Sequence, residues 1–382
     1  MPYWRLAAVY FFYFAYLGAF APYFSLYLSS LGIAATGIGV IMALPQLVRI
    51  GAPYLWGWLA DRGGHRLRVA RVCTAIGTAV YCGLFAAQGV ETLFAIVLLM
   101  SFFLSAALPQ VEITTLSHLG ERSAGYGRVR VWGSLGFIAA VLAVGYVLDW
   151  LPVAVLLWIM LAILLGVTVL LMLVPEAPHV EHARDQVPIG RVMRDRRVVA
   201  LIVACALMAV AHGPYYTFYS LYLVDHGYSK GAVGWLWSVG VICEIAIFFW
   251  MAHLFRAFTL RAVLIASFAL AAMRFAIIAW CADYLWLLLV AQTLHAATFG
   301  SFHAAALGLV HRFFSGHHQA RGQAIYTSLT FGLGGTLGGL YAGYAWQNFG
   351  AGVTFTGAAL CALAGMLILC YGLRDAAAAR HI

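Results

Sequence analysis

Twelve long apolar runs constrain this chain more than any other feature. They cover roughly residues 4–31, 36–60, 69–88, 92–118, 129–149 and 152–174, then 198–225, 229–254, 260–281, 284–311, 321–346 and 350–373. A membrane-spanning helix needs about 20 apolar residues, and open sheet edges are not tolerated in lipid. The pattern therefore predicts an all-α membrane protein of twelve transmembrane helices in two six-helix bundles.

The composition excludes a water-soluble protein. Hydrophobic residues make up 64% of the chain and charged residues 9%, whereas soluble domains carry about 25% charged residues. The first apolar run, Leu6 to Leu31, is too long for a cleaved signal peptide and is predicted to be the first span. The seven cysteines are scattered through apolar stretches without metal-ligand spacing, so we predict no metal site.

The chain is predicted to divide at its one long polar segment. We expect an N-terminal bundle over 1–174, a cytoplasmic linker over 175–197, a C-terminal bundle over 198–373 and a cytoplasmic tail over 374–382. The formal charge is +9, and most basic residues fall at one end of the predicted spans. The positive-inside rule therefore predicts that both termini are cytoplasmic.

The two halves repeat at an offset of 195 residues. Ser25–Leu28 and Ser220–Leu223 have the same sequence and end the first and seventh runs, and Gly32 corresponds to Gly227. Parallel repeats of this kind are typical of secondary transporters, which bind substrate near the midplane and rock the halves about it. A glycine-rich stretch of the eleventh run would suit close helix contact at such a moving interface. Its glycines are Gly334, Gly335, Gly338, Gly339 and Gly343.

The loop between the second and third runs resembles the loop signature of the major facilitator superfamily. The matching residues are Gly57, Asp61, Arg62, Gly64, Arg66 and Arg68. The resemblance implies the major facilitator fold. We expect these residues to be conformational, with the acidic turn pairing with nearby arginines and helix ends at the cytoplasmic side. Ordinary positive-inside topology is the alternative explanation for the arginines.

Four further segments carry a closer resemblance, to the 3-phenylpropionic acid transporter family of lactose-permease-like proton symporters. They are Tyr126–Ser134, Ala211–Tyr216, Gly234–Glu244 and Gln292–His303. The resemblance implies a monomeric, proton-coupled symporter that imports a small aromatic carboxylate such as 3-phenylpropionate across the bacterial inner membrane. The alternatives are a sugar, nucleoside or other uncharged solute as substrate, a drug exporter, and a non-transporting membrane sensor.

Charged residues inside the spans are the first candidates for function, because a charge at the bilayer centre costs at least about 2.5–3.5 kcal/mol. Glu244 is the predicted proton carrier, since burial and a nearby arginine can bring its titration near neutral pH. Arg274 is expected to be the fixed charge that tunes it. A static ion pair between the two is the alternative, and Glu112 is the next candidate for the proton.

Two histidines join this proton-coupling set. His295 and His303 are eight residues apart, which on an α-helix leaves them about 80° apart around the axis, so both could border one cavity. Histidine titrates near neutrality, although each could equally be structural, as could His212. The acid that lactose-permease-like proteins carry close after this histidine is replaced by alanines at 304–306, which shifts the expected proton site to Glu244.

Substrate binding is assigned to arginines and aromatic residues. Arg49 is the first choice for the substrate carboxylate, and Arg130 with Glu112 resembles the acid–arginine pair that lactose permease uses for sugar. Arg130 could instead be a membrane-edge charge. The ring is expected to contact Tyr215, Tyr216, Tyr219 and Trp237. The sequence carries no nucleotide-binding loop or nucleophile motif, so we predict no cofactor, no enzyme activity and an ion gradient as the energy source.

Overall fold

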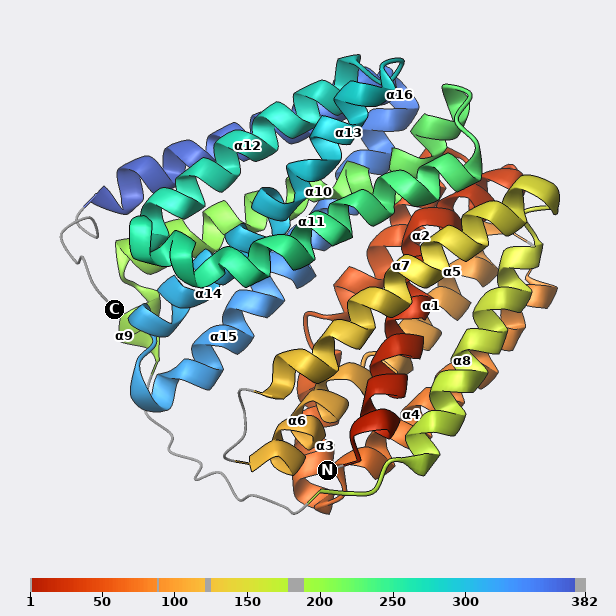
Figure 1. The fold of residues 1–382 in the computed structure, drawn as a ribbon, viewed down its shortest axis with the longest axis horizontal. Helices are drawn as coiled ribbons and strands as arrows, with labels where there is room; N and C mark the ends of the chain where they lie inside the picture. Colours follow the sequence, from red (N-terminus) through yellow and green to blue (C-terminus); the bar gives the residue numbers. More distant parts are fainter. Residues whose placement is uncertain (1, 88, 121–124, 178–188, 375–382) are drawn as a thin grey trace. The chain divides into compact units, whose positions relative to one another are not determined.

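The computed structural model describes residues 2–87, 89–120, 125–177 and 189–374, apart from the side chains of Arg191 and His317. The first half contains α1 (Tyr3–Ser30), α2 (Ala35–Val48), α3 (Ala52–Gly63), α4 (Arg66–Tyr81), the 3-10 helix η1 (Cys82–Ala86), α5 (Val90–Leu104), α6 (Ala107–Leu119), α7 (Tyr126–Trp150) and α8 (Val155–Leu173). All regular structure in these residues is helical (Figure 1).

The second half contains two π-helical segments among its helices. It consists of α9 (Gly190–Met193), α10 (Arg196–Asp225), α11 (Lys230–Ala257), α12 (Leu260–Trp280), α13 (Leu285–Thr293), the π segment η3 (Ala296–Ser301), α14 (Phe302–Phe313), the 3-10 turn η4 (Gly316–His318), α15 (Gln319–Thr327), the π segment η5 (Ser328–Gly334) and α16 (Gly335–Gly372). Asp195 caps α10 through the Arg197 backbone N–H, at 2.8 Å. The Arg197 side chain and this bond hold the pKa of Asp195 below its usual value.

Eleven helical stretches of the described residues are long and apolar enough to cross a membrane. The last of them, Gln319–Gly372, has 54 residues. Gly350 interrupts it with φ +79° and ψ 177°, a conformation that only glycine adopts readily. This stretch is therefore two spans, which confirms the predicted all-α membrane fold of twelve helices.

The second span is broken in its middle. α2 ends at Val48, the chain turns through 49–51, and α3 starts with Pro53 in its first turn. Proline has no N–H to donate and fits the first turn of a helix, not its interior. The break places Arg49 at the end of a helix, with an exposed side chain, instead of within a continuous span.

The chain forms two compact units. Unit 1 comprises the described residues of Met1–Ala183 and Gly227–Trp235, and unit 2 those of Arg184–His226 and Leu236–Ile382. α11 therefore starts in unit 1 and continues in unit 2. The predicted bundle limits at 174 and 198 stay a prediction; residues 178–188 of the predicted linker and 375–382 of the predicted tail lie outside the described residues.

The repeat has a visible backbone counterpart. Gly32 follows α1 with φ +76°, and Gly227 follows α10 with φ +83°. Both glycines adopt the left-handed conformation that ends many helices and that costs a side-chain-bearing residue energy. The same turn chemistry thus recurs at corresponding positions of the two halves.

Within each unit, glycines allow central helices to touch. A Cβ on Gly136 of α7 would fall on the backbone of Phe11 in α1, and one on Gly213 of α10 would fall on the backbone of Gly338 in α16. Gly334 likewise packs against Ala206. The glycine stretch that we expected at a moving interface therefore packs, at Gly334 and Gly338, against α10 inside unit 2.

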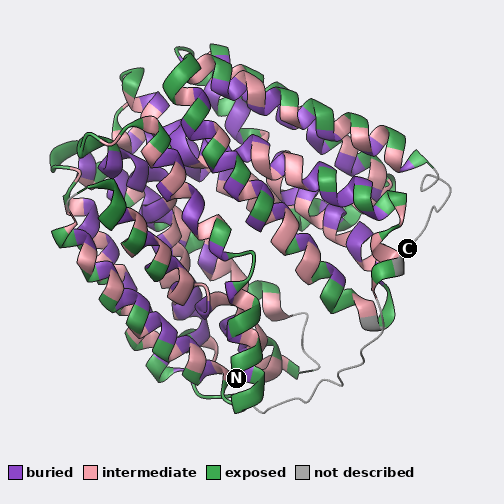
Figure 2. Cartoon of the chain, turned by 180° about the vertical axis from the view of Figure 1, so that it is seen from behind, coloured by how far each residue is buried: buried purple, intermediate pink, exposed green. Residues whose placement is uncertain are grey.

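Exposed and buried residues alternate along the helices (Figure 2). Many of the exposed residues are large and apolar. Phe249 and Trp250 of α11 and Trp158 of α8 are 79%, 64% and 64% exposed. Exposed apolar patches of this extent are typical of surfaces that contact another apolar phase, so these faces suit contact with lipid. The buried polar and charged side chains are therefore the ones that bear on function.

Candidate functional site

A single arginine forms the centre of the polar core of unit 2. Arg274 of α12 is completely buried, although it carries a permanent charge. Its Nε donates to the Ala291 carbonyl at 3.1 Å, and its Nη1 donates to Thr298 Oγ1 at 3.2 Å. The guanidinium lies 4.2 Å from the centre of the Tyr215 ring, a distance at which the ring face attracts a cation.

His212 of α10 faces this arginine in one defined tautomer. Its Nδ1 lies 2.9 Å from the Met208 carbonyl, which can only accept, and its Nε2 lies 3.5 Å from Arg274 Nη1, which can only donate. Nδ1 must therefore carry the proton, and Nε2 must be an unprotonated acceptor. His212 is held as a neutral ring.

Gln292 of α13 connects three helices of the same core. Its Oε1 accepts from the Tyr215 hydroxyl at 3.0 Å and from Arg274 Nη2 at 3.5 Å. Its Nε2 donates to the Tyr219 hydroxyl at 2.6 Å. Gln292 is fully buried, so both ends of its amide are used to hold α10 and α12 against α13.

Arg274 has no acidic partner in the part of the chain that the structure describes. No Asp or Glu oxygen of those residues lies within 4.0 Å of its guanidinium, and the four ion pairs found there involve other groups. Glu244, which we predicted to be tuned by Arg274, lies instead with its Oε2 3.8 Å from His295 Nε2. The structure thus brings Glu244 to a histidine and surrounds Arg274 with neutral groups.

His295 lies between these two groups. Its ring stacks against Tyr215 at 5.9 Å and Phe299 at 5.4 Å. The Tyr215 ring is the same one that contacts Arg274. Nδ1 of His295 is buried without a hydrogen-bond partner among the described residues, so its polar contact is made at Nε2, toward Glu244.

His303 does not join this cluster. Its ring lies 5.7 Å from Phe331 and 6.4 Å from Tyr326, in η5 and α15. The six residues of η3 between the two histidines are π-helical, with i→i+5 instead of i→i+4 bonding. The angular relation that we predicted from α-helical spacing therefore does not hold, and the two histidines contact different aromatic neighbours.

The four aromatic residues predicted to contact a substrate ring differ in exposure. Tyr215 and Tyr219 are buried, and both hydrogen-bond to Gln292. Trp237 is 4% exposed, and its indole N–H donates to Ser220 Oγ at 3.0 Å. Tyr216 is half-buried, with its ring 6.1 Å from Trp237. Of the four, Tyr216 offers the most accessible ring face in this structure.

Unit 1 contains a second set of charged side chains, which includes Glu112 and Arg130. The guanidinium of Arg130 lies 4.0 Å over the Phe14 ring. A Cβ at Gly133 would come within 2.9 Å of Arg130 Nη1, so glycine leaves room for this side chain. Glu112 accepts from the Tyr126 hydroxyl at 3.2 Å.

The charges of unit 1 act on several tyrosine side chains. Tyr13 is acted on electrostatically by Arg49, Glu112 and Arg130, and Tyr10 and Tyr126 by Glu112 and Arg130. No ion pair within 4.0 Å joins Glu112 and Arg130 in the described part of the chain. Glu112 and Arg130 therefore contact aromatic side chains and do not form a closed ion pair with each other.

The segment of residues 57–68 comprises the end of α3, a short turn at residues 64–65 and the start of α4. Gly64 ends α3 with φ +68°, and the Asp61 carboxylate pairs with Arg66. The Glu176 carboxylate accepts from the backbone N–H groups of Leu67 and Arg68, at 3.3 and 3.0 Å. A carboxylate at a helix N-terminus is stabilising, so Glu176 fixes the start of α4, a contact that the sequence analysis missed.

Two further polar residues were missed, Gln292 and Thr298. Both are fully buried and both bond to Arg274. Because they are uncharged, the cost of burying a charge did not single them out. The sequence did contain a signal for them, because each is a polar residue within an apolar run. Gln292 precedes His295 by three residues, and Thr298 follows it by three.

In the described residues, twelve helical segments are long and apolar enough to cross a membrane, and both units carry charged side chains inside them. This is the architecture of a multi-pass secondary transporter of the major facilitator superfamily. The chain belongs to the MFS_1 like family, which matches residues 3–357. This confirms the resemblance seen in the sequence, and it places the chain among transporters, not enzymes.

Known relatives cover nearly the whole chain. The "Probable 3-phenylpropionic acid transporter" of Escherichia coli (strain K12) is 28% identical over 369 residues, covering 95% of this chain and 96% of the relative. The "Maltose permease" of Geobacillus stearothermophilus is 28% identical over 368 residues, covering 94% and 92%. The solved nucleoside transporter NupG has the same fold, with a TM-score of 0.84 at 18% identity, covering 98% and 100%.

Proposed function

We propose that this protein is a proton-coupled symporter that imports a small aromatic carboxylate, such as 3-phenylpropionate, across the bacterial inner membrane by alternating access. Both termini are cytoplasmic in this proposal, and the protein acts as a monomer. The observation that carries it is the Glu244–His295 contact at 3.8 Å beside a fully buried Arg274. Similarity to a relative named for 3-phenylpropionic acid supports the substrate class.

The proton is assigned to the Glu244–His295 pair. A carboxylate and an imidazole can each take up and release a proton, whereas the Arg274 guanidinium cannot release its proton. The Glu244 side chain is 19% exposed and that of His295 is 8% exposed. Glu244 is therefore the more accessible of the two, while His295 connects it to the Tyr215 ring that contacts Arg274.

The substrate carboxylate is assigned to the arginines of unit 1. Arg274 is fully buried, and its guanidinium donates hydrogen bonds to neutral groups of unit 2. A substrate therefore cannot reach it in this structure. Arg49 is exposed, and Arg130 is half-buried with its contacts made to rings. We assign the carboxylate to Arg49 first, with Arg130 as its supporting cation. The ring contact expected at Tyr216 of unit 2 stays a prediction.

An uncharged solute is the second candidate. The maltose permease is as similar to this chain as the 3-phenylpropionic acid relative. In that case Glu112 and Arg130 would act as hydrogen-bonding groups for hydroxyls. Glu112 already accepts a hydroxyl hydrogen bond, from Tyr126, which is the chemistry that a sugar would use.

Uptake by reconstituted protein separates the candidates. Proteoliposomes with an imposed pH gradient, acid outside, should accumulate labelled 3-phenylpropionate, and an uncoupler should abolish the accumulation. Labelled maltose and uridine serve as matched substrates in the same vesicles. Accumulation of maltose or uridine without the acid would replace the substrate proposal, and sodium-driven uptake without a pH effect would refute proton coupling.

A further inference from the structure

A small cavity lies inside unit 1, apart from the groups assigned above to the proton. Its volume is about 20 Å³, and its lining comes from α1, α4, α5, α6 and α8. A cavity needs roughly 10–15 Å³ to hold one water molecule, and the water needs at least two polar partners. Leu104, Ala107, Leu164 and Val167 supply the apolar part of the lining.

Thr74 of α4 lines this cavity with an unused polar group. The residue is fully buried, and its Oγ1 has no hydrogen-bond partner among the described residues. Thr78 and Thr115, in comparison, donate to the carbonyl four residues earlier, at 2.8 and 2.7 Å. An unsatisfied buried hydroxyl is costly, so a partner from solvent is expected.

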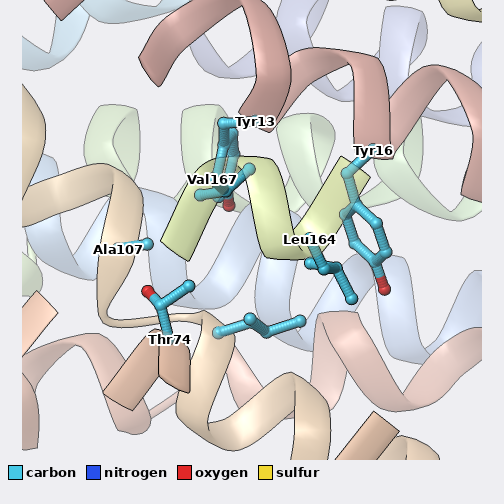
Figure 3. Close-up of a pocket in the computed structure, with 7 residues that line it drawn as sticks. Tyr13, Tyr16, Thr74, Ala107, Leu164 and Val167 are labelled. Carbon is cyan, nitrogen blue, oxygen red and sulfur yellow. The ribbon is translucent and has the colours of Figure 1, made fainter. Parts of the chain in front are cut away.

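Tyr13 supplies a second polar group to the same cavity. Figure 3 shows Tyr13 and Thr74 extending toward it from α1 and α4. Tyr13 is also the residue on which the charges of Arg49, Glu112 and Arg130 act. Tyr13 therefore lines the cavity and is also acted on by the charges of these three side chains.

We propose that this cavity binds one water molecule that bridges Thr74 Oγ1 and the Tyr13 hydroxyl. The water satisfies Thr74 and fixes the orientation of the Tyr13 hydroxyl beside the three charged side chains. Tyr13 thereby becomes a positioning residue of unit 1. The effect on substrate binding rests on the proposed function, whereas the water site does not.

Thermal unfolding of purified protein without substrate tests the water site. Thr74→Val keeps the side-chain shape and removes the hydroxyl. With a bridging water, the melting temperature falls because the water loses a partner. With a dry cavity, it stays or rises, because an unsatisfied hydroxyl has been removed. Thr114→Val is the matched control, since Thr114 Oγ1 is also buried without a described partner but does not line the cavity.

A double-mutant cycle with Tyr13→Phe tests the bridge itself. If one water joins the two hydroxyls, the second substitution costs less than it does alone, so the shifts in melting temperature are not additive. Additive shifts, or a Thr74→Val protein that gains stability as the Thr114→Val protein does, would overturn the proposal. So would a high-resolution map of the wild-type protein without density in the cavity.

Substrate affinity provides the separate test of the positioning role. A neutral hydrogen bond is worth about 0.5–1.5 kcal/mol, so Tyr13→Phe and Thr74→Val should each weaken binding of the transported substrate about 2- to 12-fold. Thr114→Val should leave it unchanged. Non-additive shifts in melting temperature with unchanged substrate affinity would keep the water and reject the positioning role. The stability measurement does not depend on which solute is transported.

Discussion

His212 Nε2 faces Arg274 Nη1 at 3.5 Å, while the opposite ring nitrogen donates to the Met208 carbonyl at 2.9 Å. The two partners leave a single way to place the ring proton, because a carbonyl only accepts and a guanidinium only donates. A second proton on His212 would put two cations in contact inside a fully buried cluster. His212 therefore acts as a fixed acceptor that helps to hold Arg274.

His212→Gln should leave the pH dependence of uptake unchanged. A glutamine amide has one donor and one acceptor end, so it can replace the two bonds without titrating. His295→Gln is the matched comparison, and it should shift the pH profile because His295 contacts Glu244. Initial uptake rates between pH 5.5 and 8.5 measure both. A shifted profile in the His212 variant would place this histidine in the proton pathway.

Glu244→Gln should separate binding from proton coupling. The amide keeps the shape of the side chain and its ability to hydrogen-bond but cannot carry a proton. Substrate exchange at equal concentrations should persist, while accumulation driven by a pH gradient is lost. Glu112→Gln is the matched control, because Glu112 bonds to Tyr126 and not to a histidine. Unimpaired uphill uptake by the Glu244 variant would move the proton to another group.

The spans and the repeat could be predicted from the sequence because their signals are local. Apolar length alone identifies a span, and the paired glycines at 32 and 227 mark turns whose left-handed conformation follows from glycine chemistry. The charged members of the candidate site were found for a similar reason, since burial of a charge is costly wherever it occurs.

The contacts within the site could not be predicted from the sequence. The π segment η3 depends on packing of the folded bundle. It changes the angle between the directions in which His295 and His303 project from the helix. The break after Val48 exposes Arg49, although the apolar run continues through it. Gln292 and Thr298 were missed because an uncharged polar side chain acquires its role only from the buried arginine beside it.

Asp149→Ala should destabilise the start of α11. Both oxygens of the Asp149 carboxylate accept from the first backbone N–H groups of this helix, from Lys230 at 2.6 Å and Gly231 at 3.0 Å. Loss of a helix N-cap costs about 0.5–2 kcal/mol, so the variant should melt at a lower temperature. Asp149→Asn keeps one accepting oxygen and should lie between wild type and the alanine variant. Equal melting temperatures for all three would show that the cap contributes nothing.

Arg49→Gln should weaken binding of the acid substrate. A hydrogen bond to a charged group contributes about 1.5–3 kcal/mol, and each 1.4 kcal/mol is a factor of ten, so the expected loss is about 10- to 150-fold. Arg49→Lys should be only partly tolerated, because the forked geometry is lost. Because Arg49 is exposed at the end of α2, neither substitution should lower the melting temperature of the protein.

The amide of the same substrate distinguishes recognition of the carboxylate from a general effect on the site. It lacks the negative charge, so it should bind the wild-type protein weakly and respond little to Arg49→Gln. Arg130→Gln is the matched variant within unit 1, and isothermal titration of both ligands on the three proteins gives the comparison. An equal loss for acid and amide in the Arg49 variant, with a selective loss for the acid in the Arg130 variant, would transfer the carboxylate to Arg130, whose guanidinium Phe14 already orients.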